Sequence, residues 1–212
     1  MKRYCLFLIA LLAVLSSCAT PNNCMVGDSY YNKDVNAAIY KLCTANGINP
    51  SDIQYCVVGG QDVNAQMGIG GILSITMGTI DLARNTDREL LACVIAHELS
   101  HYALNHLTKH NAISIGTTAA FVVAGAFIPG VGLLNHVVNP TVCKAYGRSN
   151  ELDADVNAVK MCNNAGFFQG PEPYLRMLET LSSLYPNQGG SLWATHPSWD
   201  DRIEAVKSAY PQ

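Results

Sequence analysis

The sequence is poor in charged residues and lacks the clusters of like charge that mark a nucleic-acid-binding surface. Only 14% of its 212 residues are Asp, Glu, Lys or Arg, and its formal net charge is −3. If processing removes Lys2 and Arg3, 11 of the 13 basic residues remain against 16 acidic ones, which gives −5. A weakly acidic chain without a run of like charge does not favour a nucleic-acid partner.

Charge is absent altogether between Asn111 and Cys143, where no Asp, Glu, Lys or Arg occurs. Residues 112–128 are almost continuously apolar, but this run is slightly short for a membrane span and glycines interrupt it. We expect residues 112–138 to form a helical hairpin that packs on the core or lies at a membrane surface. A true membrane span is the alternative.

The N-terminus has the layout of a secretory signal peptide, because Lys2 and Arg3 precede an uncharged apolar stretch over residues 4–15. The following Leu-Ser-Ser-Cys, ending at Cys18, resembles the bacterial lipobox. That resemblance implies that residues 1–17 are removed and that Cys18 carries the lipid. Ala19 in place of an aspartate then favours the outer membrane, facing the periplasm. An ordinary signal peptide or an anchor helix with an incidental cysteine is the alternative.

The cysteines show no CxxC spacing, which excludes a zinc ribbon and a CxxC redox motif. Cys5 would leave with the signal peptide and Cys18 would carry the lipid. An even number remains, as an oxidising compartment favours, so we expect structural disulfides of open connectivity. The remaining cysteines are Cys24, Cys43, Cys56, Cys93, Cys143 and Cys162.

The mature chain, residues 18–212, is long enough for one domain with a substantial core and short for two. Apolar periodicity and turn residues predict helices over 33–46, from 87 onward, over 148–165, over 172–184 and up to about 209, and strands over 53–58 and 71–77. Thr86 and Glu89 match a capping box, which predicts a helix that begins at Asp87.

The helix that begins at Asp87 carries an HExxH motif. His97 and His101 lie four residues apart, about 40° around the helix axis, so both imidazoles can reach one metal ion. Glu98 lies beside them as a general base. Because a catalytic zinc normally takes three protein ligands, a third ligand must come from elsewhere. A metzincin site is excluded, since Leu107 occupies the position of its third histidine.

A second carboxylate-bearing helix supplies the missing ligand. Glu151 and Asp155 share the inward stripe of this helix with Ala158 and Cys162. Carboxylates that face inward are costly unless they are paired or bind a metal. We predict that Glu151 completes a His₂Glu zinc site and that Asp155 accepts a hydrogen bond from the outer nitrogen of a ligating histidine. Satisfied core histidines and a solvated acidic face are the alternative.

These motifs resemble the gluzincin metallopeptidase family that includes the CAAX prenyl endopeptidases and the HtpX-type heat-shock proteases, with periplasmic lipoprotein relatives. Ser100 and Gly147 depart from the usual family residues, but neither is a predicted ligand. The resemblance implies an α+β fold, a mainly helical domain with a small β-sheet beside the HExxH helix. The matching segments are 64–65, 70–78, 87–106, 146–155, 195–197 and 202–203.

Four further residues match the family pattern or lie near the motif. His196, before Pro197, is a candidate oxyanion stabiliser or removable fourth ligand, with a structural loop role as the alternative. Tyr146 and Arg202 are further candidates. His106, if the helix continued, would lie about 140° from His101 and could not reach the same ion, so we interpret it as structural.

The resemblance implies a zinc-dependent endopeptidase (EC 3.4.24 type) with one Zn²⁺ per chain, which acts on misfolded or misassembled envelope proteins through a zinc-bound water activated by Glu98. Extended polypeptides would pair with the strand over 71–77, which we expect to be the sheet edge. Membrane attachment would come from the lipid on Cys18 and from 112–138. The alternative function is an envelope assembly or chaperone lipoprotein with a restrained zinc site.

Overall fold

The computed structural model describes residues 24–25, 30–68, 70–127, 135–186 and 198–211. The predicted signal peptide (1–17), Cys18 and His196 lie outside this part of the chain. The described helices are α2 (Tyr30–Ala45), the short 3₁₀ helix η2 (Pro50–Asp52), α3 (Met77–Asn85), α4 (Arg88–Ala103), α5 (His106–Phe127), α6 (Asn135–Asn164), α7 (Glu172–Leu184) and α8 (Trp199–Ala209). The described strands are β1 (Cys24–Met25), β2 (Gln54–Val58), β3 (Ala65–Gly68) and β4 (Ile72–Thr76).

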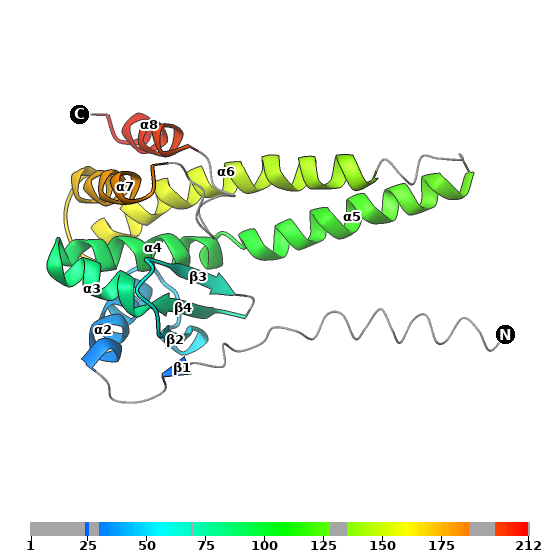
Figure 1. The fold of residues 1–212 in the computed structure, drawn as a ribbon. Helices are drawn as coiled ribbons and strands as arrows, with labels where there is room; N and C mark the ends of the chain where they lie inside the picture. Colours follow the sequence, from blue (N-terminus) through cyan, green and yellow to red (C-terminus); the bar gives the residue numbers. More distant parts are fainter. Residues whose placement is uncertain (1–23, 26–29, 69, 128–134, 187–197, 212) are drawn as a thin grey trace.

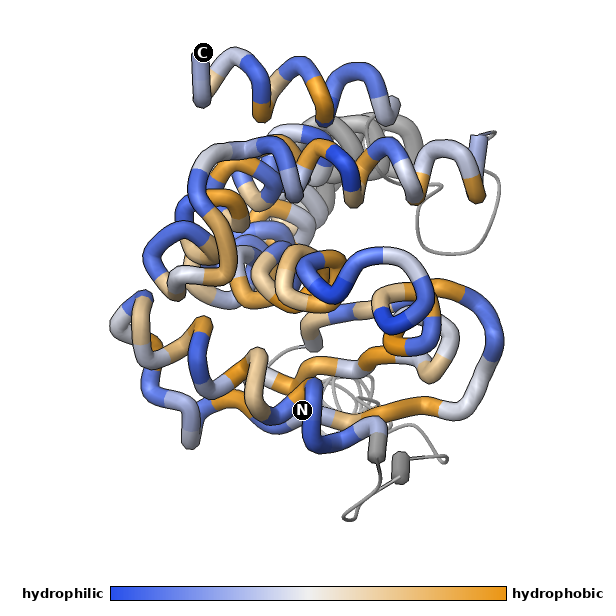
Figure 2. Tube along the Cα trace, turned by 90° about the vertical axis from the view of Figure 1, so that its left-hand side faces the viewer, coloured by the Kyte–Doolittle hydropathy of each residue, from blue (hydrophilic) through white to orange (hydrophobic). Residues whose placement is uncertain are grey.

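Helix α4 lies at the centre of the fold, with α2, α3 and the sheet on one side and α6, α7 and α8 on the other (Figure 1). The buried apolar residues of these elements form one core cluster, and Figure 2 shows apolar positions recurring along the strands and helices. The predicted class, mainly helical α+β with a small sheet beside the HExxH helix, is confirmed. Every residue of α4 from Leu90 to Ser100 is buried, as the central position of this helix requires.

The strands form one sheet in the order β1-β2-β4-β3. β2 and β4 pair in parallel, and β3 and β4 pair antiparallel. Strand β4 is therefore interior, and the expectation that the segment over 71–77 is the sheet edge is wrong. The edge beside α4 is β3, which the sequence analysis missed because its four residues follow a polar turn.

A crossing loop allows β3 to reach the far side of β4. The loop passes so close to the start of α3 that a Cβ on Gly78 would lie 2.3 Å from the carbonyl oxygen of Gln61. The Thr76 hydroxyl donates to the Asp62 carbonyl at 2.6 Å, and the Asn64 N–H donates to Thr79 Oγ1 at 2.7 Å. These bonds fix the loop and hence the position of the edge strand.

The cap of α4 differs from the predicted capping box. Asp87 is the N-cap, and its side chain accepts from the Glu89 N–H at 2.9 Å. Thr86 instead ends α3 and donates its hydroxyl to the Leu82 carbonyl at 2.7 Å. The capping box is wrong because α3, which was not expected, already uses Thr86.

Helix α5 and the first half of α6 run side by side, away from the other helices and the sheet (Figure 1). This pairing of two helices agrees with the expected hairpin, whose residues 128–134 lie outside the described part of the chain. Helix α6 begins 13 residues before the predicted start at 148. Over the residues that the structure describes, no helix has both the length and the apolar character to cross a bilayer.

The cysteines with described side chains depart from the expected disulfide framework. Cys43, Cys93 and Cys162 are free thiols in the core, and Cys56 is disulfide-bonded. The expectation of disulfides is therefore wrong for these three thiols. Cys93 and Cys162 face each other across the α4–α6 contact, so they fill the interior between the two helices.

Candidate metal centre

The structure brings His97, His101 and Glu151 together between α4 and α6. His97 Nε2 lies 3.2 Å from His101 Nε2 and 3.2 Å from Glu151 Oε2. His101 Nε2 lies 3.4 Å from Glu151 Oε1. Among the described residues these three form the one group of His, Cys, Asp and Glu side chains able to hold a metal ion.

The spacing of the three ligand atoms fits a small tetrahedral metal ion. Bonds of about 2.0–2.1 Å to nitrogen and oxygen in tetrahedral geometry place neighbouring ligand atoms on the order of 3.3 Å apart. The two Nε2 atoms lie 3.2 Å apart, close to that value, and each lies 3.2 or 3.4 Å from a different oxygen of Glu151. Both imidazoles present the same nitrogen, Nε2, so their Nδ1 atoms are left for outer hydrogen bonds.

Asp155 lies against the outer nitrogen of His97. Its Oδ1 lies 2.9 Å from His97 Nδ1, and Arg202 approaches the same carboxylate through Nε and Nη2 at 2.7 and 2.6 Å. Tyr174 donates its hydroxyl to Asp155 Oδ1 at 2.8 Å and lies 3.2 Å from His97 Nδ1. These four side chains are almost completely buried, so the network fixes the His97 ring.

Tyr174 was missed by the sequence analysis. It is on α7, which the apolar periodicity predicted correctly, but there it belongs to the buried stripe and nothing in its spacing separates it from core residues. Arg202, on α8, was a candidate without a partner. Only the packing of α6, α7 and α8 around His97 brings Tyr174 and Arg202 to Asp155.

Glu98 is tied to the edge strand. The backbone N–H of Met67 in β3 donates to Glu98 Oε2 at 2.6 Å, and both residues are buried. The bond restricts the carboxylate while leaving Oε1 for a further partner. The edge strand and the candidate general base are therefore joined directly, a contact that no sequence pattern indicates because the donor is backbone.

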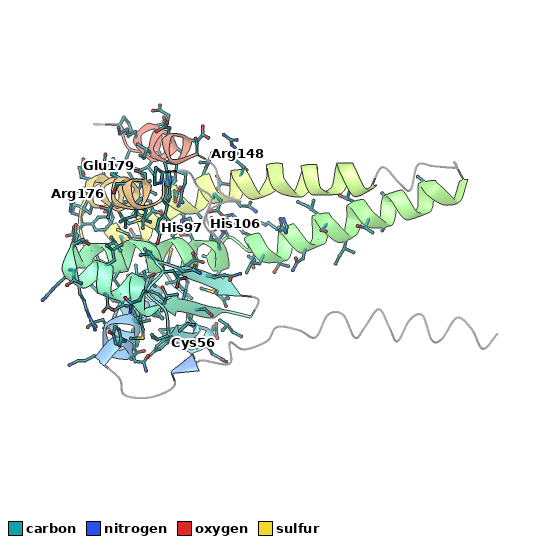
Figure 3. All side chains as sticks on the ribbon, viewed as in Figure 1. Cys56, His97, His106, Arg148, Arg176 and Glu179 are labelled. Carbon is teal, nitrogen blue, oxygen red and sulfur yellow. The ribbon has the colours of Figure 1, made fainter. Side chains whose placement is uncertain are left out.

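His106 makes a contact that the prediction of a continuous helix excluded. Helix α4 ends at Ala103, and Asn105 adopts a left-handed φ of 55°. The chain turns there, and His106 Nδ1 lies 3.1 Å from His101 Nδ1. In Figure 3, His97 and His106 lie close together where α4 meets α5.

The charges around the site set its protonation. Burial lowers the pKa of His97, but hydrogen bonds to Asp155 and Glu151 outweigh it and raise the pKa to about 10. Burial raises the pKa of Asp155, but the charge of Arg202 lowers it to about 2. Burial, aided by His101, lowers the pKa of His106 to about 4. Since a ligating histidine is neutral, metal binding at His97 displaces a proton.

The remaining predicted residues do not add to the described site. His196 lies outside the described residues, and so does the side chain of Tyr146. Cys93 lies one turn before His97 on α4 but is a free, buried thiol that faces Cys162.

Comparison with known proteins relates the chain to one peptidase family. The model of peptidase family M48 matches residues 29–210, which include all three candidate ligands. The chain is 28% identical over 167 residues to the metalloprotease LoiP of Escherichia coli (strain K12), a match that covers 76% of the chain and 64% of the relative.

Two further relatives have related names. The metalloprotease YcaL of Escherichia coli (strain K12) is 26% identical over 168 residues, 76% of the chain and 64% of that protein. A putative beta-barrel assembly-enhancing protease of Vibrio cholerae serotype O1 is 22% identical over 195 residues, 86% of the chain and 40% of that protein. The chain thus spans less than two thirds of the length of each relative.

Proposed function

Because the chain belongs to peptidase family M48, we propose that it is a zinc-dependent endopeptidase of the bacterial cell envelope. The observation that carries the proposal is the approach of His97, His101 and Glu151 to within 3.4 Å of one another, with Glu98 next to them on α4. Two imidazoles and one carboxylate form the donor set of many catalytic zinc sites.

Zinc in this site would polarise the scissile carbonyl and acidify a water molecule. Glu98 would take the proton of that water on its other oxygen, Oε1, and pass it to the leaving amine. Asp155 would keep His97 in the tautomer that presents Nε2 to the metal. The Glu98 carboxylate, which the Met67 N–H already holds in place, needs little reorganisation to act as the general base.

The edge of β3 gives the substrate a place to bind. The outward-facing N–H of Met67 points at Glu98, so this edge borders the metal site. An extended peptide that paired with β3 would lie between the sheet edge and α4, with its scissile bond near the metal. Backbone pairing of this kind requires an extended, unfolded segment and selects sequence weakly.

Envelope proteins that are misfolded or misassembled are the substrates we propose, because one relative is named for beta-barrel assembly. The lipobox-like sequence before Cys18 would attach the enzyme to the membrane. Replacing Cys18 by serine should therefore release the protein from the membrane fraction. A Cys18→Ser protein that stays in the membrane fraction would contradict the lipid anchor.

His196 is proposed as a residue that acts at the metal, either as an oxyanion stabiliser or as a removable ligand. Replacing His196 by alanine should lower turnover while the zinc content stays at about one per chain. Unchanged turnover would contradict either role.

The central test compares the purified full chain with its Glu98→Gln variant. Metal analysis should find about one zinc per chain in both, whereas cleavage of reduced, unfolded casein should fall by roughly 10² to 10⁴ in the variant. Glu89→Gln is the matched control, because Glu89 lies on the same helix but pairs with Arg176 at the surface. Equal cleavage by the wild type and Glu98→Gln would remove the peptidase proposal.

The same variant separates the peptidase from an assembly or chaperone factor. A factor that acts by binding alone would support outer-membrane assembly equally well with or without the Glu98 carboxylate. Loss of that support in Glu98→Gln, with normal protein level and zinc content, favours proteolysis.

A further inference from the structure

His106 packs against the ligand His101 at the start of α5. The side chain of His106 is buried, with the residue 5% exposed. Its Nδ1 lies 3.1 Å from His101 Nδ1, and the two rings meet edge to face with their centroids 5.1 Å apart. This contact and the metal triad occupy opposite sides of the His101 ring.

The roles of the two nitrogens follow from the metal side of His101. Its Nε2 faces His97 and Glu151, and a neutral imidazole that ligates through Nε2 carries its proton on Nδ1. His101 Nδ1–H is then the donor, and His106 Nδ1 is the acceptor. His106 therefore gives the N–H of the partly buried His101 ring a hydrogen-bond partner within the protein.

The chain bends to make this contact. The Asn105 N–H donates to the Tyr102 carbonyl at 3.1 Å, and the Asn105 carbonyl accepts from the Lys109 N–H at 3.0 Å. Asn105 thus closes α4 and opens α5 with a φ of 55°. This left-handed conformation is costly for most residues other than glycine but is tolerated by asparagine. The bend moves His106 from the opposite side of a continuous helix to a position against His101.

We propose that His106 is a positioning residue that fixes the ring orientation and tautomer of His101, an inference that rests on the proposed zinc site. The two histidine ligands then have different outer partners: His97 is held by the carboxylate of Asp155, and His101 by a neutral imidazole. Outer partners of this kind orient the ligand and raise metal affinity. Since His106 is the first residue of α5, this support of the metal site comes from the base of the hairpin.

The test measures zinc affinity of the full chain by competition with a chromophoric chelator. His106→Leu keeps the bulk and removes the acceptor, and it should weaken zinc binding by about 10- to 100-fold. His106→Asn places an acceptor oxygen near the position of Nδ1 and should therefore bind zinc about tenfold more tightly than His106→Leu. His110→Leu, one turn further along α5, is the matched control and should bind zinc as the wild type does.

A merely structural role would give a different pattern. His106→Leu and His106→Asn would then lose zinc affinity equally, and the melting temperature of the chelator-treated protein would fall in both. That result, or equal zinc affinities of His106→Leu and the wild type, would overturn the proposal. A wild type that binds zinc but cleaves no peptide would contradict only the peptidase function, whereas a wild type that binds no zinc would contradict both.

Discussion

Arg202 donates two hydrogen bonds to Asp155 in the interior of the protein, through Nε and Nη2. The Nε–Oδ2 and Nη2–Oδ1 distances are 2.7 and 2.6 Å, and the two side chains are 1% and 0% exposed. The pair joins α8 to α6, and Asp155 in turn contacts Nδ1 of His97. The C-terminal helix therefore supports the metal site. Breaking a buried ion pair leaves its other charge uncompensated, which is more costly than losing a surface pair.

Asp155→Asn should lower the free energy of unfolding by about 3 to 5 kcal/mol, because the buried charge of Arg202 would lose the carboxylate with which it forms two hydrogen bonds. Urea unfolding of the full chain measures the change. Asp153→Asn is the matched control, since Asp153 is exposed on the same helix and its loss should have almost no effect. A similar stability for both variants would show that the buried pair contributes little.

The pH dependence of stability should differ between the wild type and Asp155→Asn. The pKa of Asp155 is about 2 in the folded chain against an ordinary value of 3.8, so the unfolded chain takes up the proton first on acidification. The stabilisation is therefore complete above about pH 5 and is lost as the pH falls towards 2. The free energy of unfolding, measured at steps between pH 5 and 2, should fall more steeply with decreasing pH in the wild type than in Asp155→Asn. Parallel curves for the two proteins would contradict this.

Met67→Pro should impair turnover without removing the metal. Proline lacks the N–H that holds Glu98, and edge strands tolerate proline where the N–H faces outward. We expect turnover to fall by roughly tenfold or more with unchanged zinc content. Met67→Ala keeps the N–H and is the control for loss of the side chain. If the proline and alanine variants cleave unfolded casein at equal rates, the bond to Glu98 has no role in catalysis.

The buried thiols should resist modification in the native protein. Burial raises the pKa of Cys43 to about 11 and that of Cys93 well above its ordinary value, and the thiolate is the reactive form. At pH 8, a thiol reagent should label Cys43, Cys93 and Cys162 only after unfolding in urea, which mass spectrometry of the labelled peptides measures. Rapid labelling of these cysteines in the native chain would contradict their burial.

Local patterns sufficed for much of the helical framework. The 172–184 prediction matches α7. The last helix ends at Ala209, as predicted, and Ser198 caps its start by accepting from the Asp201 N–H at 3.2 Å. Gly166 follows α6 with a left-handed φ of 64°, where the sequence predicted the helix end. These features depend on side chains a few residues apart, so they can be predicted without the tertiary structure.

The predictions that failed depended on distant partners. β3 is too short to give a clear alternating pattern, and it forms only because the loop over Gly78 brings it beside β4. Helix α4 is buried on all sides from Leu90 to Ser100, which only its neighbours in the fold explain. The turn at Asn105 has no strong breaker such as glycine or proline, so the sequence predicted one helix through His106.

By itself, the sequence determined which residues form the candidate metal group, because His97 and His101 on one helix and Glu151 with Asp155 on another follow from a spacing of four residues. Only the tertiary structure decided what holds that group. Tyr174 and Arg202 reach Asp155 from two other helices, the Met67 N–H reaches Glu98 from a strand, and His106 reaches His101 around a turn. Hydrogen bonds between elements depend on how those elements pack, and no local periodicity encodes them.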